Sequence, residues 1–434
     1  MKLTFFGEIG TDKTSTILVE SDYGSSILLD CGMVPGKPNQ PIIHDYIINE
    51  IEVILLTHAH LDHWGYLPWI VRKGFNKKII MTKPTYSLLE EFAFKAYFEF
   101  LDEPDKKIYQ ETIHRIKKLI KLVDFGEPIK TMNFKIIFLP ANHILGAAQI
   151  FIQELYSKKQ LLYTGDINPV QPPLFDSISI NQLAKDYKLN KCFKAVIIEC
   201  SNINQNNLDE KKEEKRFIEL VNEIYFNGGN ILVPCSALGD AQEFLIRYLG
   251  YCLNHQLGMP DHFFVLGSLI AVNRVYYKYK DYFKNPKLIE LFNSNMTLKD
   301  FGGYICENYS GITDLYFNEW NYGMNLFLAT GGNLIGGSSK KLFDFLKDNP
   351  QNLIVLHKKI ENLNCRAKVL HSNIFSLHGN FISLIRYISE LNECENPIFY
   401  IIHGSKENKK ELQDHLNKKK INNCIPEKGK EYII

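Results

Sequence analysis

The sequence predicts an α/β protein in which one domain is inserted into another, and three observations lead to this prediction. The chain has 434 residues, of which 45% are hydrophobic, and this exceeds what one ordinary domain needs for its core. Strand and helix patterns alternate from Lys185 to Leu356, as in a parallel sheet covered by helices. Histidines follow strands before this region and again after it, which indicates that the chain returns to its first domain.

The composition is that of a globular protein and excludes several classes. A formal net charge of +1 gives no overall field that attracts a polyanion, so binding of nucleic acid needs a local patch. The nine cysteines are scattered and form no Cys-x-x-Cys pair, which argues against a disulfide framework or a thiolate zinc site. We find no signal-peptide pattern and no apolar run of membrane-spanning length. We therefore expect a cytoplasmic protein that does not associate with membranes.

The first domain opens with three short strands separated by glycines. Leu3 to Phe6, Ser15 to Glu20 and Ser26 to Asp30 have the pattern of a β-meander. The third strand ends in Asp30, and a carboxylate at the end of an apolar strand is costly unless it is hydrogen-bonded.

Three histidines and an aspartate follow the apolar run that ends at Leu56. In an extended chain alternate side chains point to the same side, so His58 and His60 can share one metal ion. Asp62 and His63 lie where the chain turns into a helix, and they can reach a second ion. Imidazole nitrogen and carboxylate oxygen favour zinc, with manganese or iron as less favoured ions. The spacing predicts a dinuclear site, and a set of purely structural histidines is the disfavoured alternative.

Two later strands end in further candidate ligands. The strand from Phe134 to Leu139 leads to His143, and the strand from Gln160 to Tyr163 leads to Asp166. A single residue of this kind is usually structural, but a metal loop that lacks ligands reverses this expectation. We expect His143 to complete the first metal site and Asp166 to bridge both sites.

The alternating region predicts the second domain. We expect strands at Ala195 to Ile198, Ile231 to Val233, Phe263 to Leu266, Leu326 to Ala329 and Leu353 to Leu356, with helices at Leu208 to Phe226, Asp240 to Tyr251, Ile270 to Tyr279 and Ser339 to Lys347. The expected limits are residues 1–200 for the first part of the outer domain, 201–370 for the inserted domain and 371–434 for the second part. Tyr86 to Leu101 is expected to be a core-facing helix of the first part.

The stretch from His58 to His63 resembles the His-x-His-x-Asp-His signature of the metallo-β-lactamase superfamily, whose fold is an αβ/βα sandwich with the metals at one edge. Over essentially the whole chain the sequence resembles the β-CASP branch of that superfamily, in which a β-CASP α/β domain is inserted into the lactamase fold. This second resemblance rests on Glu199 at a strand end, on His378 after Phe-Ser-Leu, and on His403. The last position is His in RNA-processing members and Val in many DNA-repair members.

The resemblance implies a role for each candidate residue. One zinc ion is held by His58, His60, His143 and Asp166, and the other by Asp62, His63, Asp166 and His403, while Asp30 supports the metal loop without binding metal. The two ions activate a shared water for attack on phosphorus. The expected catalytic residues are Asp62, His378, which protonates the leaving oxygen, and Glu199, which orients His378.

The glycine-rich segment around Gly331, Gly332 and Ser338 resembles the family's segment before a helix, and its backbone N–H groups are expected to bind phosphate. An ordinary strand-to-helix turn is the alternative reading. Asp240 and Asn380 depart from the family pattern, where Arg and Asp are usual. A protein partner or a second copy of the chain is therefore a candidate source of additional substrate contacts.

The implied function is that of a phosphodiesterase with two zinc ions, or manganese in their place, that hydrolyses single-stranded RNA. Endonuclease action is favoured over 5′-exonuclease action because Phe375 to His378 is closer to the 3′-end-processing members. A DNA-directed nuclease of the same branch is disfavoured by His403. A catalytically weak subunit of a complex is disfavoured because every ligand position is filled, and a small-molecule hydrolase would not need the inserted domain.

Overall fold

The chain forms two compact units, and the second is inserted into the first. The computed structural model describes residues 1–7, 14–33, 43–99, 101–170, 174–203, 210–258, 260–285, 304–306, 324–357, 360, 363–372, 374–393 and 395–434. Unit 1 comprises residues 1–171, 177–206 and 378–434, and unit 2 comprises residues 172–176 and 207–377. The inserted α/β domain expected from the sequence is thus confirmed, while the limits at residues 200 and 370 remain predictions.

Unit 1 contains two seven-stranded sheets. The strands of the first sheet, in spatial order, are β20 (Glu431–Ile433), β1 (Lys2–Phe5), β2 (Ile17–Glu20), β3 (Ser26–Leu29), β4 (Ile51–Leu55), β5 (Lys78–Thr82) and β6 (Ile120–Val123). Those of the second are β19 (Asn423–Cys424), β18 (Ile398–Ile402), β11 (Ala195–Glu199), β10 (Gln160–Tyr163), β9 (Ala148–Glu154), β8 (Phe134–Pro140) and β7 (Pro128–Lys130). Both sheets are mixed, because each joins a parallel half to antiparallel strands.

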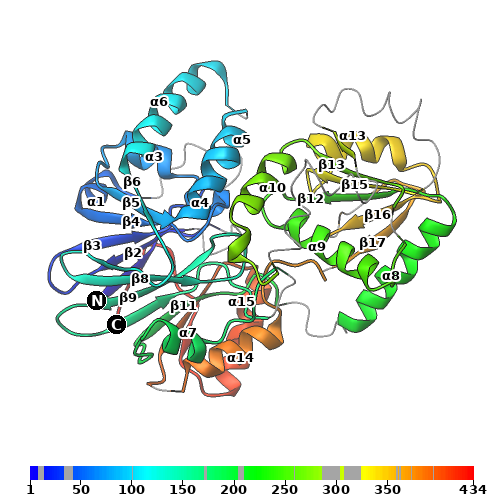
Figure 1. Cartoon of the computed structure of the whole chain (residues 1–434). Helices are drawn as coiled ribbons and strands as arrows, with labels where there is room; N and C mark the ends of the chain where they lie inside the picture. The colour runs from blue at the N-terminus through cyan, green and yellow to red at the C-terminus, as the bar shows by residue number, and fades with distance from the viewer. Residues whose placement is uncertain are drawn as a thin grey trace. The chain divides into compact units, whose positions relative to one another are not determined.

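The two sheets of unit 1 pack face to face. Alternate residues point to opposite faces of a strand, so Ile136 and Phe138 of β8 join the core between the sheets, together with Leu3 and Ile27 of the first sheet. Ile137 of β8 belongs to a second core on the outer face, under helices. Figure 1 shows helices covering the outer side of each sheet, which is the αβ/βα order expected from the sequence.

The described helices of unit 1 are short apart from α6, α14 and α15. They are α1 (Asp45–Glu50), α2 (Leu61–Trp64), α3 (Leu67–Arg72), α4 (Lys83–Leu88), α5 (Phe94–Glu99), α6 (Glu103–Leu119), α7 (Ile180–Asp186), α14 (Phe381–Leu391) and α15 (Lys406–Lys418). The helix expected from Tyr86 to Leu101 begins earlier and is interrupted, because a π-helical turn, η1 (Leu89–Ala93), separates α4 from α5. No helix in the described parts of the chain is long and apolar enough to cross a membrane.

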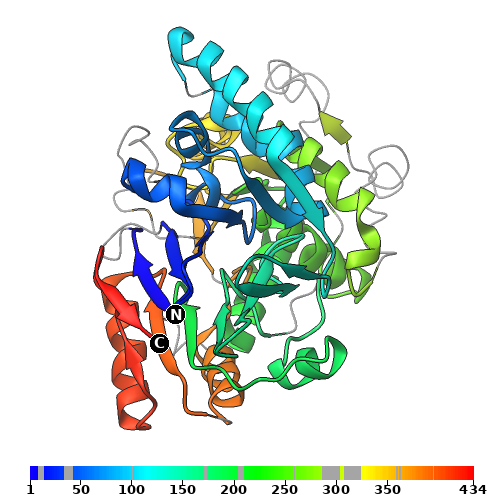
Figure 2. The ribbon, with the colours of Figure 1, turned by 90° about the vertical axis from the view of Figure 1, so that its left-hand side faces the viewer.

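The two ends of the chain meet in the first sheet. Lys2 of β1 lies opposite Ile433 of β20, and the Ile434 N–H donates to the Met1 carbonyl at 3.0 Å. Figure 2 shows the two termini side by side. The C-terminal part therefore completes the sandwich that the N-terminal part begins.

Unit 2 is built on one parallel sheet. Its strands, in spatial order, are β14 (Tyr304–Cys306), β13 (His262–Leu266), β15 (Asn325–Thr330), β12 (Ile231–Cys235), β16 (Leu353–Leu356) and β17 (Lys368–His371). The helical segments are α8 (Glu210–Phe226), α9 (Asp240–Leu253), α10 (Leu269–Lys278), η2 (Lys280–Tyr282) and α13 (Gly337–Leu346). Strands β12, β15 and β16 are buried along most of their length, as is usual where helices cover both faces of a parallel sheet.

Candidate metal centre

Four strands of the second sheet end at the same edge and bring distant residues together. Strands β10, β11 and β18 are parallel neighbours, and β8 runs in the same direction because β9 is antiparallel to both β8 and β10. The residues that follow their carboxyl ends therefore gather at one edge: His143 after β8, Asp166 after β10 and His403 after β18, with Glu199 as the last residue of β11. The loop after β4 of the facing sheet reaches this edge, since the Ala148 N–H donates to the Thr57 carbonyl at 3.0 Å.

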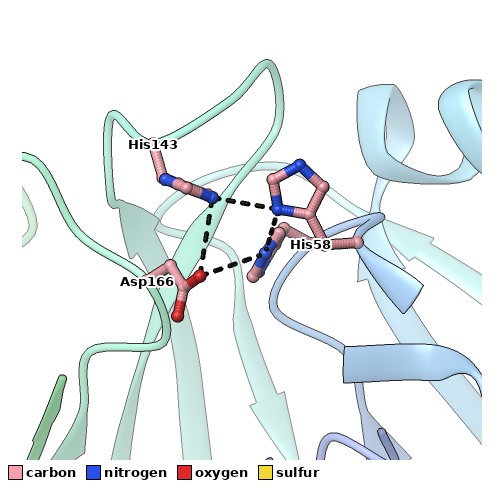
Figure 3. A group of neighbouring side chains, drawn as sticks. His58, His143 and Asp166 are labelled. Atoms are coloured by element: carbon pink, nitrogen blue, oxygen red, sulfur yellow. Dashed lines mark hydrogen bonds and ion pairs between the residues drawn. The ribbon is translucent and has the colours of Figure 1, made fainter. Parts of the chain in front are cut away.

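A first group of four donor side chains converges there, which we call the first donor set: His58, His60, His143 and Asp166. His60 Nδ1 lies 3.1 Å from both His58 Nε2 and His143 Nε2. The Oδ2 atom of Asp166 lies 3.7 Å from His58 Nε2 and 3.5 Å from His143 Nε2. Figure 3 shows His143 and Asp166 pointing toward His58 from their loops.

A second group lies beside the first and shares Asp166. We call it the second donor set: Asp62, His63, Asp166 and His403. His403 Nε2 is 3.2 Å from Asp62 Oδ2, and its Nδ1 is 3.3 Å from Asp166 Oδ1. His63 Nε2 is 3.4 Å from the same Asp166 oxygen. The two oxygens of Asp166 thus face different donor sets, as a bridging carboxylate requires.

The distances fit divalent metal ions. Ligand atoms around a tetrahedral zinc ion, with Zn–N bonds of about 2.0–2.1 Å, lie roughly 3.3–3.4 Å from one another. A hydrogen on His60 Nδ1 can form a hydrogen bond to His58 Nε2 or to His143 Nε2, but not to both at once. A cation, in contrast, can bind all four donor atoms of the set. His63 Nε2 and Asp166 Oδ1 are buried and have no hydrogen-bond partner within the described residues. Buried polar atoms without partners are costly, and a bound cation would remove that cost.

The electrostatics place two of these groups in metal-binding protonation states. Burial lowers the pKa of His58, and the neighbouring His63 acts in the same direction, so the His58 imidazole is neutral. Burial alone would raise the pKa of Asp166, but His403 and His63 bring it well below its ordinary value. Neutral imidazole and ionised carboxylate are the forms that bind a cation.

Helix α2, which carries Asp62 and His63, is held by the segment after β3. Cys31 N–H donates to the His63 carbonyl at 2.7 Å, and Met33 N–H donates to the Leu61 carbonyl at 3.3 Å. Between them, a Cβ on Gly32 would lie 1.7 Å from the Asp62 carbonyl oxygen, so only glycine allows this approach. The sequence therefore fixes the position of α2 through backbone contacts.

Asp30 organises the base of the metal loop. This buried carboxylate accepts hydrogen bonds from Thr57 N–H at 2.7 Å, Thr57 Oγ1 at 2.8 Å, Tyr163 Oη at 2.6 Å and His63 Nδ1 at 2.7 Å. Because Thr57 Oγ1 gives its hydrogen to Asp30, it can accept from His58 Nδ1, which lies 3.0 Å away. Each of the two rings thus has an acceptor at Nδ1, and its Nε2 faces a donor set.

Thr57 and Tyr163 were not predicted from the sequence. The position of Thr57 directly before His58 was the available local signal, since an adjacent hydroxyl can reach the imidazole. Tyr163 gave no such signal, because it meets Asp30 only through the packing of the two sheets.

Glu199 and His378 form a pair next to the first donor set. His378 Nδ1 lies 2.8 Å from Glu199 Oε1, and the rings of His378 and His143 have centroids 4.5 Å apart. Glu199 also accepts from the N–H groups of Ile167 at 3.1 Å and Ser201 at 2.7 Å. Burial would raise the pKa of Glu199, but His378 holds it below its ordinary value.

The glycine-rich segment predicted to bind substrate lies in unit 2, between β15 and α13. The Gly331 N–H donates to the Cys235 carbonyl at 3.2 Å, so it is engaged within the fold. Ser338 lies in the first turn of α13, with its Oγ 3.3 Å from Thr330 Oγ1. Gly332 lies in the turn between them, and phosphate binding by this segment stays a prediction.

Several known proteins are similar to this chain in sequence. A family model described as the metallo-beta-lactamase superfamily matches residues 9–197. The chain is 29% identical to an RNase J-like protein of Methanocaldococcus jannaschii, over 93% of this chain and 92% of that protein. It is 26% identical to the endoribonuclease YSH1 of Eremothecium gossypii, over 81% of this chain but only 46% of that longer protein.

A solved structure supports the fold alone. The crystal structure of a protein of unknown function from Enterococcus faecalis V583 matches with a TM-score of 0.57 and 15% sequence identity. The match covers 100% of this chain and 99% of that one, so the sandwich and the inserted unit occur together in both.

Proposed function

Since this chain belongs to the metallo-β-lactamase superfamily, in its β-CASP branch, we propose that it is a metal-dependent nuclease that hydrolyses phosphodiester bonds in RNA. The observation that carries the proposal is the convergence of seven donor side chains from segments between residues 58 and 403 at one sheet edge. Such a set is typical of dinuclear hydrolases, in which both ions act on one phosphate.

We propose two zinc ions, one in each donor set, with manganese as the alternative. Bound divalent ions lower the pKa of water and neutralise charge on phosphate oxygens. Within the chain, Asp30 and Thr57 keep the imidazoles of His58 and His63 oriented for this role. Asp62 belongs to the second donor set, and its side chain is only partly buried.

His378 is proposed as the general acid. Its Nδ1 faces Glu199, so the hydrogen available for transfer is on Nε2, and Glu199 stabilises the protonated ring. Proton donation to a leaving oxygen contributes typically about 10²- to 10⁴-fold in rate. The neighbouring ring of His143 places His378 at the edge of the first donor set.

RNA is the proposed substrate, and internal cleavage is the proposed mode. The relatives named above are an RNase J-like protein and an endoribonuclease. His403 at the position that is Val in many DNA-repair members supports RNA over DNA, and Phe375 to His378 supports endonuclease action. The described cysteines form no disulfide bond with one another, which suits a reducing compartment such as the cytoplasm.

Metal analysis combined with cleavage mapping tests the proposal. The purified full-length chain is assayed for bound zinc and manganese, and then incubated with 5′-labelled RNA and DNA oligonucleotides of one sequence. We expect bound zinc, internal cleavage of the RNA, and loss of cleavage after chelation with recovery on adding zinc. Cleavage of DNA in preference to RNA would overturn the substrate, and absence of bound metal would overturn the mechanism.

A pair of histidine variants separates the metal centre from general effects. His58→Ala removes a buried member of the first donor set and should abolish both metal binding at that set and cleavage. His114→Ala changes an exposed histidine on α6 and should preserve both. Equal activity of the two variants would contradict the assignment of His58.

A further inference from the structure

Ser201 contacts His403, the member of the second donor set that comes last in the sequence. Its Oγ lies 2.9 Å from His403 Nδ1 and donates to the His403 carbonyl oxygen at 3.0 Å. Ser201 follows β11, whereas His403 follows the parallel neighbour β18, so the contact depends on the pairing of these strands. His403 has a φ of 46°, in the left-handed region, and its ring therefore projects from an unusual backbone conformation.

The positions of the hydrogens define what this contact does. A serine hydroxyl has one hydrogen, and here that hydrogen has an acceptor in the His403 carbonyl. The lone pairs of Oγ are then available to accept the hydrogen on His403 Nδ1. A hydrogen on Nδ1 leaves Nε2 of the neutral ring without one, and Nε2 is the nitrogen that lies 3.2 Å from Asp62.

The Oδ1 atom of Asp166 also lies near His403 Nδ1, at 3.3 Å, but it makes no hydrogen bond to it. The same Asp166 oxygen faces His63 Nε2 and belongs to the second donor set, so a metal ion there would compete for it. A metal ion would not compete for the Ser201 hydroxyl, because among the donor residues its Oγ is hydrogen-bonded only to His403.

We infer that Ser201 is a positioning residue that selectively controls metal binding at the second donor set. Its hydroxyl fixes the hydrogen of His403 on Nδ1 and directs Nε2 toward Asp62, while it contacts no member of the first set. The inference rests on the metal centre of the proposed function and deepens it by assigning a hydroxyl partner to a histidine of each set: Thr57 to His58, and Ser201 to His403.

The backbone at Ser201 is held independently of its side chain. The Ser201 N–H donates to Glu199 at 2.7 Å, and its carbonyl accepts from Asn408 Nδ2 at 2.9 Å. Cys200 N–H donates to the His403 carbonyl at 3.1 Å, so this oxygen keeps a partner when the hydroxyl is removed. Ser201→Ala therefore removes the contact to the ring and leaves the surrounding loop in place.

Cobalt titration of the metal-free full-length chain tests the inference. Binding to the two donor sets is followed by visible absorption, and affinities are measured by competition with a chelator. For Ser201→Ala we expect the phase of binding that His58→Ala leaves intact to lose about 10- to 100-fold in affinity, as is usual when a partner of a metal-binding histidine is removed. Binding at the other phase should be unchanged, and Ser201→Thr, which keeps the hydroxyl, should restore the affected phase.

Ser405→Ala is the matched control. Ser405 lies two residues after His403, but its hydroxyl caps α15 by accepting from Asn408 N–H at 3.1 Å, and we expect wild-type cobalt binding. Equal loss in the Ser405 and Ser201 variants would show a general loop effect and overturn the inference. Unchanged binding in Ser201→Ala would also overturn it, with the metal centre intact. A wild-type chain that binds no second ion would instead refute the proposed metal centre.

Discussion

Replacing Asp30 with asparagine should weaken both the fold and the metal centre. The carboxylate is fully buried and accepts from four donors on three residues: Thr57, His63 and Tyr163. Asparagine has nearly the same size, so the change creates no cavity. The change does replace Oδ2, which accepts from Thr57 Oγ1, His63 Nδ1 and Tyr163 Oη, with an amino group that cannot accept these hydrogen bonds.

The magnitude follows from the bonds that are lost. The remaining amide oxygen can still accept from the Thr57 N–H, and the Thr57 hydroxyl can rotate to accept from the new amino group, while hydrogen bonds from Tyr163 and His63 lose their charged acceptor. Two hydrogen bonds to a charged group are worth about 1.5–3 kcal/mol each, so the expected loss is about 3–6 kcal/mol. At roughly 2–4 °C per kcal/mol for a domain of 150–250 residues, the unfolding temperature should fall by at least about 6 °C.

Calorimetry of the metal-free Asp30→Asn variant measures the loss of stability, and elemental analysis of the variant purified with zinc measures its effect on binding. Asp124→Asn is the control, since Asp124 pairs with Lys83 at 2.6 Å on the surface and exposed pairs contribute about 0–1 kcal/mol. If Asp30→Asn unfolds at the wild-type temperature and keeps its full zinc content, the four hydrogen bonds do not organise the metal loop.

Three further changes have distinct expected outcomes. His378→Ala should reduce RNA cleavage by about 10²- to 10⁴-fold while zinc content stays at the wild-type level, and loss of zinc would refute its role as general acid. Gly32→Ala should displace α2 and lower zinc affinity, because its Cβ meets the carbonyl of the helix, whereas Gly250→Ala, where a Cβ meets nothing within 4 Å, should leave zinc affinity unchanged. Glu154 should make the fold sensitive to acid. Burial raises the pKa of its carboxylate, but hydrogen bonds from serine hydroxyls and a backbone N–H have the larger, opposite effect, so the pKa lies below its ordinary value of 4.5. Its contribution to stability is thus present above pH 4.5 and is lost as the pH falls through the lowered pKa. The unfolding temperature of Glu154→Gln should therefore depend less on pH in that range than that of the wild-type protein. Parallel plots of unfolding temperature against pH for the variant and the wild type would contradict this.

The regular elements of the fold were predictable because their patterns are local. Buried strands such as β10 and β16 coincide with the predicted apolar runs, since a strand buried on both faces needs an unbroken apolar sequence. The short edge strands were not predicted. β20 is a clear case, because only its pairing with β1 at the opposite end of the chain makes it a strand.

The candidate site divides in the same way. His58 to His63 stand within six residues of one another, so their spacing alone predicted shared metal ions. His143, Asp166 and His403 were found as single residues after strands, and their convergence depends on four strands of one sheet running in the same direction. The contact of Ser201 with His403 joins residues 202 positions apart, so no local sequence pattern could predict it.

The order of the donors along the polypeptide has a consequence for biosynthesis. Every member of the first donor set has been translated once Asp166 has left the ribosome, before unit 2 is made. His378 and His403 follow only after unit 2 is complete. A nascent or prematurely terminated chain that ends within unit 2 therefore lacks His378 and His403, the proposed general acid and the proposed last ligand of the second donor set.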